Sequence, residues 1–395
     1  MGARWRGIGT GCFMDRHAAE RTRQQIIRLC HAGLDSRTLR SQTLQALRKV
    51  IAVDVAFFAT TDPATVLFTG AVVDDVLHQN TPYFLDNEFL QDDVNKFAEL
   101  ARGTRHVCGL GEATQGELGR SQRYRELLAP LALGDELRAA LTVGSSCWGV
   151  MCLHRERSSP NFTPSEAAFL ARLAPHLAQG LRTSLLLNSA MASQAPAGPG
   201  LVVLGEDLSI AAITPAAQQW LAELAASDSL QHSGLPHVIW HVASRLRALE
   251  NNAPTAADPM PRARVRTMSG RWTVVHASRL IGPGTERQIA VIIEDAQPSE
   301  IVPLIAQAYD LSRRESEVVQ SLTRGLSTIE VAGALCISSN TVQDHLKTIF
   351  DKVGVRSRRE LVAQIFTQQY RPHIAAGASP GADGSFQGGG SREIR

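Results

Sequence analysis

The sequence predicts a multidomain protein in which two α+β domains are followed by an all-α domain of four helices. Its 395 residues are more than one domain usually holds. Apolar residues make up 44% of the chain and charged residues 20%, which is the composition of an ordinary globular protein. Residues 189–200 are rich in Ala, Pro, Gly and Ser, as linkers are. Three S-x-x-E spacings after residue 311 each precede a periodic apolar run and mark helix starts.

The net charge of +2 conceals an uneven distribution. Residues 1–50 carry ten Lys and Arg against three Asp and Glu, whereas residues 51–309 carry 19 against 26. This balance excludes a uniformly basic nucleic-acid coat, so any binding to nucleic acid must come from the local placement of charge. Residues 1–20 are expected to form a basic extension, with either Met1 or Met14 as the start of the protein.

The six cysteines are scattered and form no C-x-x-C pair, which argues against a disulfide framework and against a four-ligand zinc site. Cys147 and Cys152 are separated by an odd number of residues in one predicted hairpin, so we expect them on opposite faces. No apolar segment suits a secretory signal or a membrane span. We therefore expect a cytoplasmic protein without a membrane partner.

The first α+β domain is predicted over residues 21–188. Two helices begin near Arg21 and Arg37, and a third, with apolar residues at 3–4 spacing, runs from Pro164 to about Leu187. The turn Gly144-Ser145-Ser146 joins two apolar runs as a hairpin. The predicted strands are 53–60, 66–73, 137–143 and 148–154, and further helical segments are expected at 87–102 and 122–133.

The second α+β domain is predicted over residues 201–296. Its expected strands are 201–204, 208–213, 262–267, 271–279 and 288–293, and its expected helices are 215–226 and 236–249. Pro298 and Pro303 bracket a short connector into the last domain. The chain is rich in Gly and Ser from Gly377 onward, so residues 374–395 are expected to be disordered.

The helices of the last domain, residues 304–371, are predicted from their N-terminal caps. Ser312, Ser327 and Ser357 are each followed three residues later by Glu, which is the spacing of a capping box. Ser338 is the natural N-cap of the remaining helix. Because each cap is followed by apolar residues at helical spacing, four helices are expected.

The second and third of these helices form a predicted helix-turn-helix motif over residues 328–347. A turn of about three residues separates them, which is typical of a motif whose second helix enters a DNA groove. The third helix has a buried stripe of Val342, Leu346, Ile349, Phe350 and Val353 and an opposite polar stripe of Asn340, Gln343, Asp344, Lys347 and Asp351. Gln pairs well with adenine, and Lys reaches guanine or a phosphate. His345 lies at the boundary of the buried stripe and is expected to be structural.

This region closely resembles the LuxR-type helix-turn-helix domain. The resemblance rests on Leu311-Ser-Arg-Arg-Glu315, on Gly325-Leu326-Ser327, and on the run from Thr341-Val342 to Lys352-Val353-Gly354-Val355-Arg356-Ser357-Arg358. It implies sequence-specific binding of double-stranded DNA by a transcriptional regulator that acts as a homodimer. RNA polymerase is a candidate partner.

The resemblance also implies roles for individual residues. Thr341 and Lys352 resemble contacts to the DNA backbone, and Gln343, Asp344 and Lys347 occupy base-reading positions. Asp344 departs from the neutral or basic residue often found there; it would repel phosphate, or it could accept from a cytosine amine. The expected DNA-binding residues are Thr341, Gln343, Asp344, Lys347, Lys352, Arg356 and Arg358.

The upstream domains resemble two sensor families. The N-terminal one resembles a GAF domain through Asp135-Glu-Leu137-Arg138, Trp148-Gly149-Val150, Arg155, Phe162-Thr163 and Leu173-Ala-Pro175-His176-Leu177. The central one is similar to a PAS fold in its strand order and in Leu201–Leu204, Pro215-Ala216-Ala217 and Gly270-Arg271-Trp272. Both families often bind small molecules or mediate dimerisation, which implies a sensor with a small-molecule effector. No ligand-binding residue can be assigned, because such pockets are lined by ordinary apolar side chains.

Enzymatic motifs are absent, so we expect no catalytic residue, no cofactor and no metal ligand. No lysine follows a glycine, which excludes a Walker A loop. His237 and His241 lie four residues apart on a predicted helix and could share a metal with His232, but surface packing of an amphipathic helix is the preferred interpretation. The competing function is a signalling adaptor whose C-terminal helical unit binds protein rather than DNA. A steep dependence of binding on salt would favour DNA.

Overall fold

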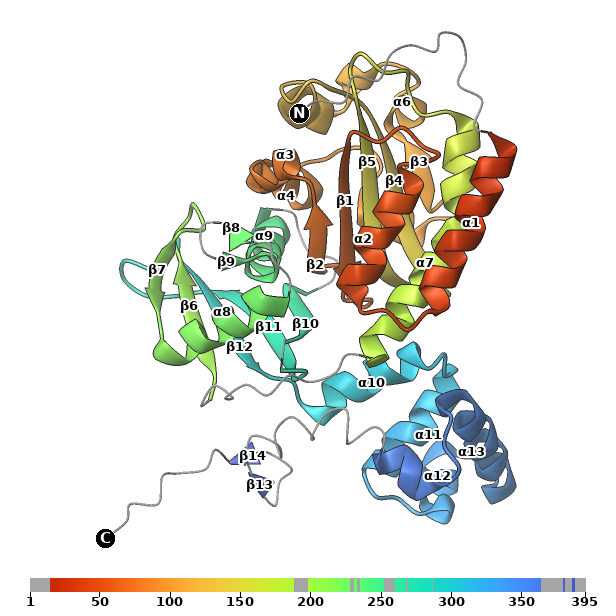
Figure 1. The fold of residues 1–395 in the computed structure, drawn as a ribbon. Coiled ribbons are helices and arrows are strands. Elements are labelled where there is room, and N and C mark those ends of the chain that lie inside the picture. Colours follow the sequence, from red (N-terminus) through yellow and green to blue (C-terminus); the bar gives the residue numbers. More distant parts are fainter. Residues whose placement is uncertain are drawn as a thin grey trace.

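The computed structural model describes residues 15–187, 198–227, 231–232, 235–251, 260–267, 269–285, 287–363, 379–380 and 386–387. Two α+β units lie side by side, and a helical unit near the C-terminus is joined to them by helix α10 (Pro298–Ala308), as Figure 1 shows.

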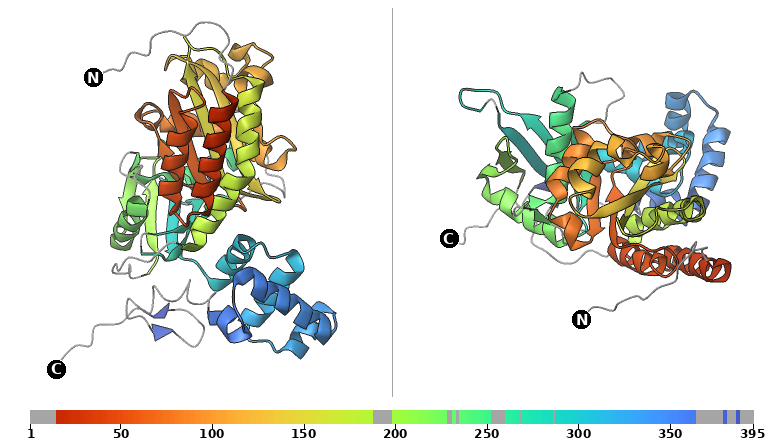
Figure 2. Two further views of the ribbon diagram at one scale, coloured as in Figure 1. Left: turned by 45° about the vertical axis from the view of Figure 1, so that its right-hand side comes forward. Right: turned by 90° about the horizontal axis from the view of Figure 1, so that it is seen from above.

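The first α+β unit is built on an antiparallel sheet of five strands in the order β2-β1-β5-β4-β3. The strands are β1 (Val55–Thr61), β2 (Phe68–Val73), β3 (Val107–Gly109), β4 (Leu133–Val143) and β5 (Ser146–Glu156). Helices α1 (Arg16–His31), α2 (Ser36–Leu47) and α7 (Pro164–Leu187) pack on one face (Figure 2). The other face is covered by α3 (Asp75–His78), α4 (Thr81–Phe89), α5 (Phe97–Arg102), α6 (Leu110–Ala113), η1 (Leu118–Arg120) and η2 (Tyr124–Leu128).

Helix α1 begins at Arg16, earlier than the predicted start near Arg21. The reason is local: the Asp15 carboxylate accepts a hydrogen bond from the backbone N–H of His17 (3.0 Å) and caps the helix. Residues 1–14 of the predicted basic extension lie outside the described residues. Of the rest of that predicted extension, Asp15 is the N-cap and residues 16–20 are helical.

A β-bulge in the β4–β5 hairpin overturns the expectation for Cys147 and Cys152. The register passes from Leu141–Gly149 directly to Thr142–Cys147, so Trp148 is an extra residue on β5. The bulge brings both cysteines into the apolar cluster under α3 to α6, whereas Trp148 belongs to the cluster on the α7 side of the sheet. Both thiols are buried and free, and burial raises the pKa of Cys147 to about 11.

The second α+β unit has a sheet of five antiparallel strands in the order β10-β11-β12-β6-β7. The strands are β6 (Gly200–Leu204), β7 (Ile210–Ile213), β10 (Arg262–Arg266), β11 (Trp272–Arg279) and β12 (Ile289–Asp295). The remaining elements are α8 (Pro215–Ser227), α9 (His237–Asn251) and the paired short strands β8 (Gln231–His232) and β9 (Leu235–Pro236). The strands of each five-stranded sheet can be numbered 1 to 5 in chain order, leaving out β8 and β9. With this numbering, and with the second sheet read from β7 to β10, both sheets have the strand order 2-1-5-4-3.

The two α+β units share one apolar core through α9, which packs against β2. Nδ1 of His241 lies 2.8 Å from the carbonyl oxygen of Phe68, and the two rings meet edge to face. An ion pair of Arg264 with Asp62 (2.6 Å) also joins the units. His237 and His241 are buried, so the predicted surface packing of this helix was wrong: its histidine face is covered by the first unit. The side chain of His232 lies outside the described part of the chain.

The region between Pro298 and Pro303, predicted as a connector, is the first part of helix α10. Pro298 is tolerated because it stands at the first turn, where a backbone donor has no partner in the helix. Ile301 and Leu304 pack into the core beside α7, whereas Val302 belongs to the core of the C-terminal unit. Helix α10 therefore joins the core of the first α+β unit to that of the helical unit.

The C-terminal unit contains α11 (Arg313–Thr323), α12 (Thr328–Leu335), α13 (Ser339–Val353) and a helical segment at 358–363. The linker residues 188–197 lie outside the described residues. In the predicted disordered tail, only β13 (Ser379–Pro380) and β14 (Phe386–Gln387) are described, and they pair antiparallel. Among the described residues, no helix combines the length and apolar character needed to cross a membrane.

Candidate functional site

The serine caps position the helices of the C-terminal unit. Two of the three predicted capping boxes are complete: Ser312 with Glu315 and Ser327 with Glu330. In the third, the Ser357 hydroxyl accepts from the backbone N–H of Glu360 (3.1 Å), but the Glu360 carboxylate accepts from the N–H of Arg356 instead of that of Ser357. Ser338 accepts from the backbone N–H of Thr341 (3.1 Å) at the start of α13, as expected. These local bonds satisfy backbone donors that a helix start leaves unpaired, so the caps determine where each helix begins.

The turn between α12 and α13 is short and tightly bonded. Cys336 has a left-handed backbone (φ 54°), and the N–H of Ile337 donates to the carbonyl oxygen of Ala332 (3.0 Å). Val331 and Ala332 are buried below this turn, where small side chains allow a close approach of the two helices. This arrangement is the predicted helix-turn-helix.

Helix α13 has the predicted two faces. Val342, Leu346, Ile349 and Val353 are buried and Phe350 is half-buried. The residues of the polar stripe are all exposed: Asn340, Gln343, Asp344, Lys347 and Asp351. Within the described part of the chain, the side chains of Gln343 and Lys347 take part in no hydrogen bond or ion pair, so they are available to an external partner.

Other residues of the predicted site already have partners inside the unit. The Lys352 ammonium donates to the Glu315 carboxylate (2.7 Å) and to the carbonyl oxygen of Asp310 (3.0 Å). Thr341 bonds through its hydroxyl to Ser338 (2.9 Å), and the Arg358 guanidinium donates to the carbonyl oxygen of Leu326. Burial would raise the pKa of Glu315, but the bonds from Lys352 and Ser312 bring this pKa below its ordinary value.

The remaining predicted residues are positioned near the end of α13. Arg356 is exposed, and its backbone N–H donates to the Glu360 carboxylate (2.7 Å). His345 is half-buried, which agrees with its expected place at the boundary of the core. The structure thus brings the exposed residues Gln343, Asp344 and Lys347 together on one helical face, with Arg356 beyond its C-terminal end.

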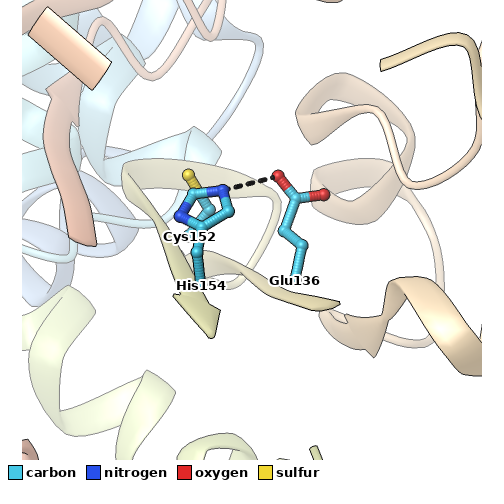
Figure 3. A group of neighbouring side chains, drawn as sticks. All are labelled: Glu136, Cys152 and His154. Atoms are coloured by element: carbon cyan, nitrogen blue, oxygen red, sulfur yellow. Dashed lines mark hydrogen bonds and ion pairs between the residues drawn. The ribbon is translucent and has the colours of Figure 1, made fainter. Parts of the chain in front are cut away.

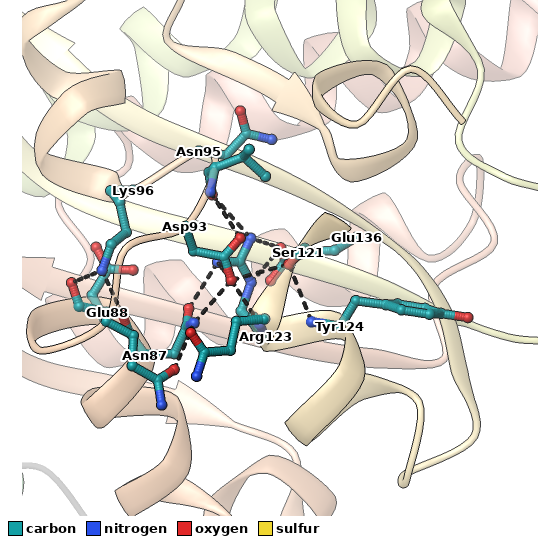
Figure 4. A network of polar contacts seen from close by, with 12 residues as sticks. Asn87, Glu88, Asp93, Asn95, Lys96, Ser121, Arg123, Tyr124 and Glu136 are labelled. Carbon is teal, nitrogen blue, oxygen red and sulfur yellow. Dashed lines mark hydrogen bonds and ion pairs between the residues drawn. The ribbon is translucent and has the colours of Figure 1, made fainter. Parts of the chain in front are cut away.

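The first α+β unit contains a buried network of charges that the sequence did not reveal (Figure 4). Arg123 and Arg138 both contact Glu136 (2.7 and 3.1 Å) at its centre. Arg138 also pairs with Glu88 (2.7 Å), and Arg123 lies 3.7 Å from Asp93. Burial would raise the pKa of Glu136, but the two guanidinium groups hold this pKa well below its ordinary value. The network attaches α4 and the following loop to β4.

Glu136, Cys152 and His154 are the one group among the described residues whose donor atoms lie within 4.8 Å of one another, as a metal site requires (Figure 3). Both carboxylate oxygens of Glu136 are already engaged, one by Arg123 and the other by Arg138 and His154. A cation here would meet two guanidinium groups at close range. The arrangement therefore favours an ion-pair network over a metal centre.

Three hollows in the described residues differ in their capacity for a ligand. The cavity between Phe57, Phe84, His237 and His241 holds about 10 Å³, which is room for one water molecule at most. A groove of about 610 Å³ lies between β3 and α7, and one of about 550 Å³ lies between the first α+β unit and the helical unit. The two grooves are in the size range of small-molecule sites.

Two family models match the chain. Residues 310–365 match the model of bacterial regulatory proteins of the luxR family, and residues 35–181 match the GAF domain. The first match covers α11 to α13, and the second covers most of the first α+β unit. Both agree with the resemblances stated from the sequence.

Curated relatives match over the C-terminal unit. The spore germination protein GerE of Bacillus subtilis is 36% identical over 55 residues, which are 14% of this chain and 74% of GerE. The transcriptional regulatory protein LnrK of the same species is 35% identical over 85 residues, 22% of this chain and 34% of LnrK. The CsgBAC operon transcriptional regulatory protein of Escherichia coli is 42% identical over 53 residues, 13% of this chain and 24% of that protein. Apart from GerE, the chain spans about a third or less of these relatives.

Solved structures match only weakly. Escherichia coli SdiA aligns over 87% of this chain and 94% of its own, with 12% identity and a TM-score of 0.29. A GAF domain/HD domain protein from Geobacter sulfurreducens aligns over 44% of this chain and 95% of its own, with 16% identity and a TM-score of 0.27. Scores this low do not establish a common fold.

Proposed function

The chain belongs to the LuxR family of bacterial regulatory proteins, and we propose that it is a DNA-binding transcriptional regulator whose recognition helix is α13. The observation that carries this proposal is the exposed polar face of α13, where Gln343 and Lys347 have no partner among the described residues. The helix follows the short turn of a helix-turn-helix, the arrangement in which the second helix enters the major groove. Binding rather than catalysis is proposed, so no catalytic residue or cofactor is assigned.

We assign the contacts as follows. Gln343, Asp344 and Lys347 read base edges, with Asp344 accepting from a cytosine amine. Thr341 and Lys352 contact the DNA backbone. An ammonium group has three N–H donors, and Lys352 uses two of them within the protein, which leaves one for a phosphate. Arg356 and Arg358 add positive charge beyond the end of α13.

The regulator is proposed to act as a homodimer. Two recognition helices about one helical turn apart would read the halves of a pseudo-palindrome. RNA polymerase is a further proposed partner, and a cytoplasmic location is proposed because a regulator must have access to double-stranded DNA.

The upstream units are proposed as the sensor. The GAF domain is assigned to residues 21–188, a PAS-like domain to residues 201–296 and the DNA-binding domain to residues 304–371. The PAS-like assignment is supported by the strand order 2-1-5-4-3, which the second sheet has in common with the sheet of the GAF unit. A small-molecule effector and dimerisation are the proposed roles of these two units.

The direct test is binding of the full-length chain to DNA. Genomic fragments retained by the protein are sequenced, and the affinity for the enriched site is measured by fluorescence anisotropy at several salt concentrations. We expect a preference for the enriched site over random duplex and a linear fall of log affinity with log salt. Equal affinity for enriched and random duplex would reject sequence-specific recognition.

Protein docking is the second candidate function of the helical unit. It is favoured by Ile329, whose side chain is 76% exposed on α12 although Ile is strongly apolar. Weak, salt-insensitive binding to every duplex, combined with saturable binding of a protein partner that Ile329→Ser abolishes, would favour this alternative.

A further inference from the structure

A further groove, on the surface of the first α+β unit, is lined by cations and by no acidic residue of the described chain. It holds about 400 Å³ and lies between α1 and the residues that follow α2. We call it the basic groove. Its lining consists of Arg21, Arg28, Lys49, Ala18, Thr22, Gln24, Gln25 and Val50. A hollow with charge of one sign attracts a partner of the opposite sign.

The three cations of the basic groove are exposed and have no partner. Among the described residues, their side chains take part in no hydrogen bond or ion pair. Elsewhere in the unit, exposed charges are paired, as Arg105 is with Glu112 (2.7 Å). Glu20, the acidic neighbour of Arg21 in the sequence, is already engaged by Arg23 (2.7 Å). An anion in the groove would therefore supply a counter-charge that the chain itself does not supply.

The spacing of the cations suits an extended anion better than a compact one. Arg21 and Arg28 are seven residues apart on α1, so they share one helical face and lie about 10 Å apart along the axis. One strand of duplex DNA carries a phosphate about every 3.4 Å, so this separation spans about three phosphates. Lys49, which follows α2, extends the charge across the groove. A nucleic-acid backbone can contact all three cations at once.

The groove reaches almost to the junction with the helical unit. A Cβ atom at Gly180 of α7 would lie 3.0 Å from Cα of Cys30, so the end of α1 packs closely on α7. Arg28 precedes Cys30 by two residues. Arg182 follows Gly180 by two residues and pairs with Asp310 (3.1 Å). Each offset is about 3 Å along its helix, so Arg28 lies near the level of Asp310.

The same junction leads to the recognition helix. The carbonyl oxygen of Asp310 accepts from Lys352 near the C-terminal end of α13 (3.0 Å). Helices α1 and α13 both lie toward the right-hand side of Figure 1 and of the view from above in Figure 2. The basic groove and α13 are thus on one side of the molecule, as two contacts to a single duplex require.

We propose that the basic groove binds the phosphate backbone of the DNA that flanks the bases recognised by α13. This inference rests on the proposed function of α13 and adds a second contact to the same duplex. Arg21, Arg28 and Lys49 neutralise phosphates and touch no base edge. The groove therefore raises the affinity for DNA without altering the sequence preference.

A variant of the full-length chain that combines Arg21→Gln, Arg28→Gln and Lys49→Gln tests the groove. Fluorescence anisotropy measures its affinity, at several salt concentrations, for a duplex of about 40 base pairs centred on the enriched site and for a random duplex of equal length. Loss of three phosphate contacts should reduce the slope of log affinity against log salt by about 2–3. Both duplexes should lose affinity by the same factor.

The matched control combines Arg102→Gln, Arg120→Gln and Arg287→Gln, which removes the same charge from exposed arginines outside the groove. It should change the salt slope by less than about 1. Duplex length provides a second comparison: when the DNA is trimmed to the enriched site, the parent chain and the groove variant should bind equally.

An unchanged salt slope in the groove variant, an equal change in the control variant, or a changed sequence preference would overturn the groove and leave the role of α13 intact. Conversely, a parent chain that does not distinguish the enriched site from random duplex would overturn the function proposed for α13, and the slope on random duplex would still test the groove. Vesicles of phosphatidylserine and phosphatidylcholine test the other extended anion. If the parent chain alone binds them while both chains bind DNA equally, the groove contacts a membrane surface and the proposal fails.

Discussion

Replacement of Lys352 by Ala tests whether this lysine stabilises the helical unit from within. Its ammonium donates to the buried Glu315 carboxylate (2.7 Å) and to the carbonyl oxygen of Asp310 (3.0 Å). A hydrogen bond between charged groups contributes about 1.5–3 kcal/mol. Because the Lys352 side chain is 33% exposed, solvent screening favours the lower end of this range, about 1.5 kcal/mol.

Hydrogen exchange of the full-length chain measures this loss locally. The amides of α11 are protected by a structure that Glu315 helps to cap, so a loss of about 1.5 kcal/mol should accelerate their exchange by about tenfold. Lys347→Ala is the matched control, because Lys347 is an exposed lysine of the same helix with no partner among the described residues. The control should leave the exchange of α11 unchanged.

The result that would refute this reasoning is unchanged protection of α11 in Lys352→Ala. If the same variant also weakened binding to all duplexes alike and reduced the salt slope by about one, Lys352 would act solely as a phosphate contact. A loss of DNA affinity confined to one base pair would contradict the assignment of Lys352 as a phosphate contact.

Further predictions concern the DNA-binding face, the joint between the α+β units and the buried charges. Lys347→Ala should weaken binding to the enriched DNA site by about 1–3 kcal/mol in fluorescence anisotropy, and an unchanged affinity and sequence preference would reject its base-reading role. Burial lowers the pKa of His241 from 6.5 to about 4, so on acidification the unfolded chain takes up this proton at a higher pH than the folded chain does. The free energy of unfolding should therefore fall by up to about 3 kcal/mol between pH 6.5 and pH 4. His241→Phe should flatten this part of the denaturation profile, and an equally steep profile would show that other groups cause it. Glu136→Gln should lower the free energy of unfolding, measured by urea denaturation, by about 3–5 kcal/mol, because two buried guanidinium groups lose the carboxylate that they share. Glu117→Gln is the control: its carboxylate belongs to an exposed ion pair, so the urea midpoint should remain nearly unchanged.

Much of the fold could be predicted from the chain because its signals are local. The caps at Ser312, Ser327 and Ser338 act within three residues and mark where helices start. The apolar period of α13 separates its buried face from its exposed one without knowledge of any other element. The same holds for the β4–β5 hairpin, whose turn residues and flanking apolar runs are contiguous.

Part of the candidate site could be predicted for the same reason. The exposure of Gln343 and Lys347 follows from the helical period. The partner of Lys352 could not be predicted from the helical period. Glu315 lies 37 residues earlier in the chain and contacts Lys352 only when α11 packs on α13. A sequence shows that a side chain is charged, but whether solvent, DNA or a carboxylate surrounds it depends on packing.

The amino-acid sequence by itself thus determined the order of the units, the helix starts and the polar face of α13. Only the tertiary structure decided that α9 is buried against β2, that Arg123, Glu136 and Arg138 form one network, and that Arg21 and Lys49 line one groove. The physical reason is range: capping and periodicity act over one or two helical turns, whereas these contacts depend on which distant surface covers a given face.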